Sequence, residues 1–326
     1  MAVSREVDWS GVGWEDWSDL AEIRARLDAG ADPHAELWYE GPPLHVAAEH
    51  GSPEVIAELA RRVDDVDAEH EGRSALWRAV FADRADNALA LVAAGADPWR
   101  PMMGGWSPGR LSLAGPTPGL FFPFPPGRPV LSEAEMAAVV EAERLIDVLG
   151  DVEYEGLGLA FAGAVTAAEV ARRLEATVTE RADIEMLLDQ PWDEQSMSVV
   201  GVTEVPGGCV VSQRWGHRPA DADVVTRLSA GTACFGMFAN PKNGDQGIGC
   251  RDGVIEEWGV LPGGSRMDRD EPAERVLAGY LYQGQSVAFS CAYAGLRPID
   301  ARSIQGPPDL WLRLPLRRGT SGQTVR

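Results

Sequence analysis

The stretch Ala29-Gly30-Ala31-Asp32-Pro33 recurs as Ala94-Gly95-Ala96-Asp97-Pro98, which lies 65 residues further along the chain. This spacing equals two periods of about 33 residues. Between the two copies, Leu44 is followed 32 residues later by Leu76, so the period also holds in the middle. Such a period is typical of stacked helix pairs, which bury their apolar faces only against one another. The sequence therefore predicts an all-α solenoid at the amino-terminal end.

The helix starts in this region resemble the ankyrin repeat. Pro43-Leu44-His45-Val46-Ala47-Ala48 matches the T-P-L-H-x-A-A signature of that family, with Pro42 in place of threonine. A second unit starts at Ser74-Ala75-Leu76-Trp77, with Trp77 in place of histidine. The resemblance implies an ankyrin-repeat domain over residues 1–115, with degenerate terminal units. It also implies that His45 has a structural role and that the repeats bind another protein.

Aromatic residues are concentrated in the same region, which holds seven of the eleven tryptophans. Packing in the core or at the ends of the stack would explain many of them. Tryptophan and tyrosine near projecting turns are also typical anchors for protein partners. We select as candidate partner contacts Trp38, Tyr39, His70, Trp99 and Trp106.

The charge of the chain limits its partners. It contains 29 basic and 50 acidic residues, a net charge of −21 over 326 residues. This charge argues against binding to nucleic acid or to an anionic membrane surface. Residues 1–150 alone hold 12 basic and 26 acidic side chains, a net charge of −14, which favours a protein partner with a basic surface. No apolar run reaches membrane-spanning length, and we expect a cytoplasmic location.

Residues 116–150 are expected to be a linker followed by a helix. Proline and glycine are dense from Pro101 to Pro129, and the phenylalanines at 121, 122 and 124 suggest that this segment lies along a domain surface. Ser132 and Glu135 form a capping box, which predicts a helix that ends at about Leu149, before Gly150.

Residues 151–326 are predicted to form an α+β domain with an antiparallel meander and helices on one face. Capping-box residues Thr166 and Glu169 start a helix, and Asp252-Gly253 predicts a hairpin turn. We expect strands near residues 197–205, 209–215, 232–239, 247–251 and 254–260, and helices near 219–228, 271–282 and 285–294. This half resembles an actinobacterial domain family of unknown function through segments such as Val200-Gly201-Val202-Thr203-Glu204-Val205, and that resemblance implies no catalytic residues.

The sequence of the second domain is compatible with two interpretations of its function. No phosphate-binding loop, nucleophile elbow or zinc motif is present, and we expect no cofactor and no metal. A pair between His217 and Cys209 or Cys250 is conceivable, but buried cysteines and a surface histidine explain them as well. The sequence therefore favours a non-catalytic interaction protein. The alternative is an enzyme or small-ligand binder whose site in the second domain or the interdomain cleft uses Arg214, His217, Arg218, Asn240 and Lys242.

Overall fold

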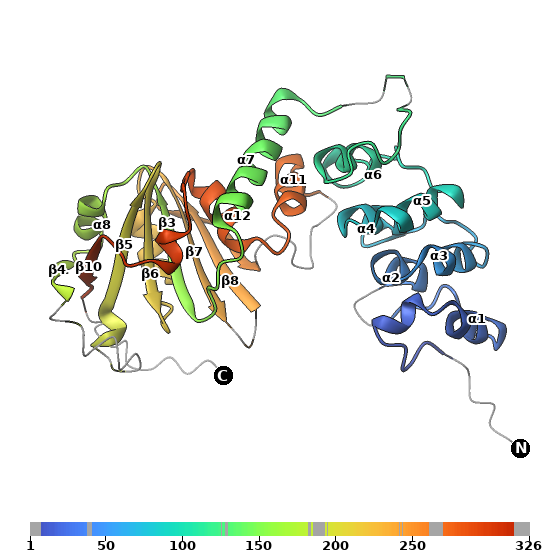
Figure 1. Cartoon of the computed structure of the whole chain (residues 1–326), viewed down its shortest axis with the longest axis horizontal. Helices are drawn as coiled ribbons and strands as arrows, with labels where there is room; N and C mark the ends of the chain where they lie inside the picture. The colour runs from blue at the N-terminus through green and yellow to red at the C-terminus, as the bar shows by residue number, and fades with distance from the viewer. Residues whose placement is uncertain are drawn as a thin grey trace, which may run out of the picture. The chain divides into compact units, whose positions relative to one another are not determined.

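The computed structural model consists of helices in the amino-terminal part and a large antiparallel sheet later in the chain (Figure 1). It describes residues 8–37, 41–124, 126–127, 130–181, 184, 193, 195–240, 242, 244–260 and 270–315. The chain divides into two compact units, of which the first contains residues 1–139 and 265–281 and the second contains residues 140–264 and 282–326.

The first unit is helical. Its elements are η1 (Glu15–Ser18), α1 (Leu20–Asp28), α2 (Pro43–His50), α3 (Pro53–Ala60), β1 (Glu69–His70), β2 (Arg73–Ser74), α4 (Ala75–Phe81), α5 (Ala85–Ala93), η2 (Met103–Gly105), α6 (Pro108–Leu111), η3 (Ser112–Ala114) and α11 (Ala273–Leu281). Helix α7 (Glu133–Leu149) crosses the division between the units.

The helices of the first unit form successive antiparallel pairs. Helix α2 packs against α3 and α4, and α5 packs against α3 and α4, so each pair lies beside the next (Figure 1). The contacts between pairs are lined by small side chains, and Ala47, Ala48, Ala75 and Ala79 are completely buried. Small side chains let the helix backbones approach closely, which gives the stack a continuous core.

Buried polar side chains also join one helix pair to the next. The Asn87 side chain on α5 donates hydrogen bonds to the backbone oxygens of Ala48 (3.1 Å) and Gly51 (3.0 Å), at the end of α2. His45 on α2 donates through Nε2 to the Arg73 carbonyl (3.0 Å) in the next turn. Carbonyls at a helix end and in a turn lack partners within a helix, so these contacts satisfy groups that packing alone would leave unpaired.

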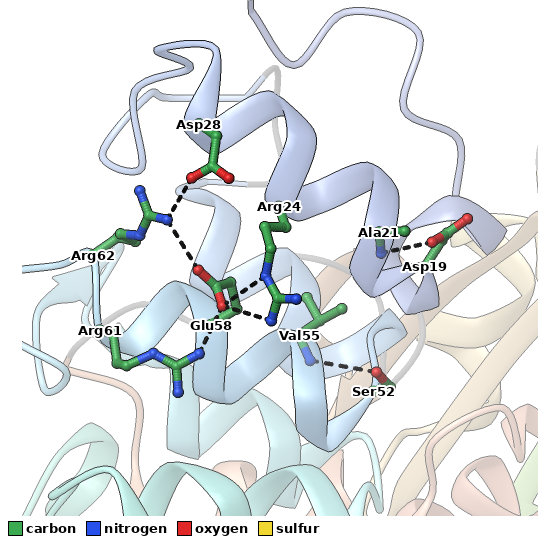
Figure 2. Close-up of polar contacts among 9 residues, drawn as sticks. All are labelled: Asp19, Ala21, Arg24, Asp28, Ser52, Val55, Glu58, Arg61 and Arg62. Atoms are coloured by element: carbon green, nitrogen blue, oxygen red, sulfur yellow. Dashed lines mark hydrogen bonds and ion pairs between the residues drawn. The ribbon is translucent and has the colours of Figure 1, made fainter.

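A buried carboxylate links the first two outer helices. Glu58 on α3 is only 4% exposed, yet it lies within 3.3 Å of three guanidinium groups, those of Arg24 on α1 and of Arg61 and Arg62, which directly follow α3 (Figure 2). Arg62 also contacts Asp28 on α1 at 2.7 Å. Hydrogen bonds from Arg61, followed by Arg24, hold the pKa of Glu58 below its ordinary value. The cluster therefore keeps a negative charge inside the stack only because cations from two helices surround it.

The extent of the first unit differs from the expected segments 1–115, 116–150 and 151–326. Helix α11, from the carboxyl-terminal half, belongs to this unit because Val276 and Leu277 are buried in its core and Trp106 donates through Nε1 to the Ala273 carbonyl (2.9 Å). The expected linker also packs here in part: Phe121 is buried, whereas Phe122 remains 75% exposed.

The second unit contains one eight-stranded sheet among its described residues. Its elements are β3 (Leu157–Gly163), α8 (Ala167–Arg173), β4 (Thr177–Thr179), η4 (Ser196–Ser198), β5 (Val199–Val205), β6 (Gly208–Arg214), η5 (Arg218–Ala220), α10 (Ala222–Leu228), β7 (Ala233–Asn240), β8 (Gly244–Arg251), β9 (Val254–Val260), α12 (Ser286–Ala294), α13 (Arg302–Gln305) and β10 (Leu310–Arg313). The strand order is β4-β10-β5-β6-β3-β7-β8-β9, and every neighbouring pair is antiparallel.

The predicted antiparallel sheet is therefore present, but the expected simple meander is wrong. Strand β3 lies between β6 and β7, and β10 lies between β4 and β5. The expectation of helices on one face is also wrong. Cys234 and Cys250 share a core with Val224 and Val225 of α10, whereas Phe235, whose side chain lies on the other face, packs against Phe289 of α12. Helices therefore pack on both faces of the sheet in this region.

The predicted helix starts at Ser132 and Thr166 and the predicted turn at Asp252-Gly253 are confirmed. Ser132 and Glu135 form the reciprocal capping box of α7, with contacts of 2.7 and 3.3 Å, and Thr166 accepts a hydrogen bond from the Glu169 amide (3.3 Å) at the start of α8. Asp252-Gly253 forms the turn between β8 and β9. These signals are confirmed because each depends on hydrogen bonds within a few residues.

Replacing Glu58 by glutamine is expected to destabilise the protein by about 1–2 kcal/mol, because three guanidinium groups then lose their shared carboxylate. Chemical denaturation at neutral pH measures the change. Glu54→Gln, an exposed position on the same helix, serves as the control and should leave the free energy of unfolding nearly unchanged. Equal effects of the two substitutions would contradict a role of Glu58 in joining α1 to α3.

The protein should lose stability as the pH falls from 6.5 to 4. Burial, and then the positive charge of Arg78, lower the pKa of His45 to about 4 from its ordinary value of 6.5. The unfolded chain therefore binds a proton in this range that the folded chain excludes, and the loss amounts to about 3 kcal/mol. The free energy of unfolding across this pH range should fall less steeply for His45→Gln than for the natural protein. Parallel curves would show that His45 does not titrate on unfolding.

Candidate functional site

A groove of about 1520 Å³ lies at one end of the sheet in the second unit. It forms where β3 and β5 begin and where β6 and β7 end, because these antiparallel strands bring those termini to the same edge. The register places Leu157 opposite Arg214 and Ala239 opposite Asp245. The loop before β3 and the segment after α13 complete its lining, which includes Glu153, Tyr154, Glu155, Leu157, Arg181, Ser196, Val199, Ser212, Arg214, Trp215, Asn240, Lys242, Asp245, Gln305, Pro308 and Trp311.

Two tryptophans line this groove. Trp215 is 47% exposed and has a backbone φ of +55°, a conformation that non-glycine residues rarely adopt. Its amide donates to the Gly156 carbonyl (2.8 Å), and its ring packs directly over Gly156. Trp311 on β10 lies opposite Gly201, whose missing side chain leaves room for Pro308. Backbone strain and an exposed indole both cost free energy, and such costs are concentrated at functional positions.

Hydrogen bonds fix the polar wall of the groove. Tyr154 donates through its hydroxyl to Asp245 (3.1 Å), and burial together with the Asp245 charge raises the pKa of Tyr154. The buried Gln213 amide donates to the carbonyls of Met197 (2.9 Å) and Val199 (3.0 Å) and accepts from the Arg218 amide (3.0 Å). The end of β6 is thereby tied to the start of β5, so the groove is held by interactions formed without a ligand.

The charged side chains of the groove are not used in ion pairs. Arg181, Arg214, Lys242, Glu153 and Glu155 are exposed, and within the described part of the chain none of them forms an ion pair. Many arginines elsewhere in the chain do pair with a carboxylate, as Arg218 does with Asp221 at 2.8 Å. The groove therefore offers both donors and acceptors to a bound molecule.

Three of the five ligand-site candidates from the sequence lie in this groove, namely Arg214, Asn240 and Lys242. His217 and Arg218 do not line it. The His217 ring contacts the ring of Phe238, whose side chain alternates with that of groove-lining Ala239 and so lies on the opposite face. Arg218 is held by Asp221 and Asp223. The positive φ at Trp215 turns the chain, so residues only three positions apart end on different sides of the sheet.

The cysteines are unsuited to nucleophilic chemistry. Cys209, Cys234, Cys250 and Cys291 are all buried free thiols. Burial raises the pKa of Cys209 and Cys291 to about 12 and raises those of the other two as well. A thiol needs its ionised form to act as a nucleophile, and these thiols stay protonated at neutral pH.

The partner-contact candidates of the first unit differ in how far their side chains are exposed. Trp38 and Tyr39 lie outside the described residues. Trp99 is 8% exposed and Trp106 is completely buried, so both are core residues and offer almost no surface to a partner. His70 is half-buried: its Nδ1 accepts from Arg78 (3.1 Å) and its Nε2 lies 3.1 Å from the Glu36 carboxylate. Of the described candidates, only His70 reaches the surface, where it lies beside the exposed Glu36.

Acidic turns connect the helix pairs at a regular interval. The carboxylates of Asp32, Asp65 and Asp97 each accept a hydrogen bond from the amide two residues later, at 2.8–2.9 Å. Asp67 in addition receives the Asp97 amide at 3.1 Å, which joins consecutive turns. We name as the turn face the acidic residues Asp32, Glu36, Asp64, Asp65, Asp67, Glu69, Glu71 and Asp97.

Several residues of the groove were missed by sequence reasoning. Tyr154, Trp215 and Trp311 carry no motif, since their positions depend on strand pairing between distant segments. Asp245 lies at the start of β8, in the polar segment that follows Asn240 in the sequence, and that segment was the one available signal. On the turn face, Asp65 was missed as well. It lies about one repeat from both Asp32 and Asp97, so the spacing of the turns could have predicted its role.

No protein-family model matches the chain, and no curated protein matches it. Among the described residues, no group of three or more histidine, cysteine, aspartate or glutamate side chains is arranged to hold a metal ion. In the same part of the chain, every helix is too short or too polar to cross a membrane.

Replacing Gly156 by alanine should displace the Trp215 ring, because the added Cβ would lie 2.8 Å from two of its atoms. Gly231→Ala is a matched control: its φ of +71° is close to the +74° of Gly156, but its surroundings are open. Both variants carry backbone strain of about 1 kcal/mol, and Gly156→Ala should lose about 1–2 kcal/mol more. Fluorine NMR of fluorotryptophan-labelled protein would detect the movement of Trp215. An unchanged Trp215 resonance would contradict its packing on Gly156.

Proposed function

We propose that this chain is a non-catalytic protein-interaction protein whose first unit is an ankyrin-repeat solenoid. The supporting observation is the set of carboxylate-closed turns at Asp32, Asp65 and Asp97, spaced 33 and 32 residues apart and each associated with a helix pair. The helix-start residue His45 supports the same assignment, because it bonds the next turn rather than facing solvent. Turns repeated at this interval form an extended surface that can bind another protein.

The chemistry of the turn face favours a basic partner. Asp64 is fully exposed, and Asp65 and Asp67 belong to the same turn. Glu71 is exposed in the following turn, between β1 and β2. Burial raises the pKa of Asp67, to which the charges of Asp65 and Asp97 contribute. Carboxylates that repel one another gain free energy when arginine or lysine side chains of a partner approach. Association through this face should therefore be fast and should weaken at high salt.

Charge reversal on the turn face tests the proposal. Protein captured from the source cells at low salt should contain a stoichiometric partner, which Asp64→Lys/Glu71→Lys should lose. The control Glu54→Lys/Asp86→Lys changes the same number of exposed charges at the starts of α3 and α5 in the same unit. We expect the turn-face variant to weaken the affinity at least about tenfold, or about 1.4 kcal/mol, and the control to change it little.

Two outcomes would count against this function. Equal loss of affinity in both double variants would show that net charge, and not the turn face, governs binding. A partner that remains bound to the Asp64→Lys/Glu71→Lys protein at unchanged affinity would place the contact elsewhere. Unfolding measurements on both variants exclude a loss of structure as the cause.

A second candidate function is the binding of a ligand in the groove of the second unit. It is favoured by one specific observation: Arg214, Asn240 and Lys242 line the groove together with the strained, half-exposed Trp215. The two functions are independent, because the turn face and the groove use residues of different units.

A further inference from the structure

The size of the groove indicates an extended ligand. Its volume of about 1520 Å³ exceeds the roughly 300–1,000 Å³ that is usual for sites of single small molecules. Its lining comes from the ends of several strands and from two flanking segments, the loop before β3 and the segment after α13. A ligand that fills it is therefore larger than a typical single small molecule.

The charges of the groove indicate a neutral ligand. Arg181, Arg214 and Lys242 supply positive charge, whereas Glu153, Glu155 and Asp245 supply negative charge. Among these described lining residues, the repulsion that an ion meets from one set of charges offsets its attraction to the other, so the groove favours neither an anion nor a cation. A neutral molecule that carries many hydroxyl groups can use both sets, because each hydroxyl donates one hydrogen bond and accepts others.

The aromatic side chains indicate flat apolar faces on the same ligand. Trp215 is held in a strained conformation with almost half of its surface exposed, and Trp311 also lines the groove. Aromatic rings bury apolar surface efficiently and present a polar atom at their edge. A pyranose ring has one face of C–H groups and a rim of hydroxyls, which matches indoles surrounded by polar side chains.

An extended peptide cannot bind in the groove by adding a strand to the sheet. A peptide that adds to a sheet needs an unpaired strand edge. Strands β5, β6, β3 and β7, which border the groove, are each paired on both sides, and the sheet ends at β4 and β9. The groove therefore recognises its ligand through side chains. We propose that it binds a neutral oligosaccharide.

Calorimetric titration with neutral oligosaccharides tests this inference. The full-length protein is titrated with malto-, cello-, xylo- and chito-oligosaccharides of increasing length. We expect one series to bind with an affinity that rises with length. Trp215→Ala and Arg214→Ala should each weaken that binding about tenfold. Trp14→Ala, which removes a tryptophan that is 58% exposed in the first unit, should leave it unchanged.

The opposite results would overturn the inference. Absence of binding to every series, or equal binding by the natural protein and Arg214→Ala, rules out an oligosaccharide site in this groove. Arg214 is exposed at a strand end, so its substitution tests the site even if Trp215→Ala fails to fold. Binding of a short peptide in place of sugars, lost in the same variants, would assign the groove to peptides. None of these results depends on the turn face, so the partner-binding proposal stands or falls separately.

Discussion

The first unit depends on the burial of alanine-rich helix faces between neighbouring pairs. Ala47, Ala48, Ala75 and Ala79 are completely buried, but each removes little apolar area from water. A single pair would therefore be unstable, and the free energy comes from the continuity of the stack. Close approach of helices also leaves no room for water, so polar groups in the contact must be satisfied by protein. Asn87 and Glu58 meet that requirement between successive pairs, and His45 meets it through its Nε2.

The sequence predicted what depends on short-range chemistry. The repeat, the capping boxes at Ser132 and Thr166 and the turn at Asp252 are patterns within a few residues or at a fixed spacing, and the structure contains a helical region followed by an antiparallel sheet. It did not predict the central position of β3 or the presence of α11 in the first unit. These depend on contacts such as that between Trp106 and Ala273, which are separated by 167 residues, and no local pattern encodes such a pairing.

The candidate site also depends on contacts that local sequence patterns do not predict. Arg214 and His217 are near neighbours in sequence, yet the turn at Trp215 sends them to opposite sides of the sheet. Conversely, Tyr154 and Asp245 are joined by a hydrogen bond although 91 residues separate them. The presence of a tryptophan in the sequence likewise did not predict whether its side chain is buried in the core or exposed. Trp99 and Trp106 are core residues, whereas Trp215 is 47% exposed and has a positive φ, features that its residue type alone does not predict.

The two proposed binding surfaces would attract their ligands by different physics. The turn face carries an excess of carboxylates near water, so the attraction proposed for a basic partner would act over about 8–10 Å and would be screened by salt. The groove has both charges and two indoles, so its attraction acts only at contact and depends little on salt. If both proposals hold, a rise in ionic strength would therefore release a partner from the first unit while a ligand stays in the second.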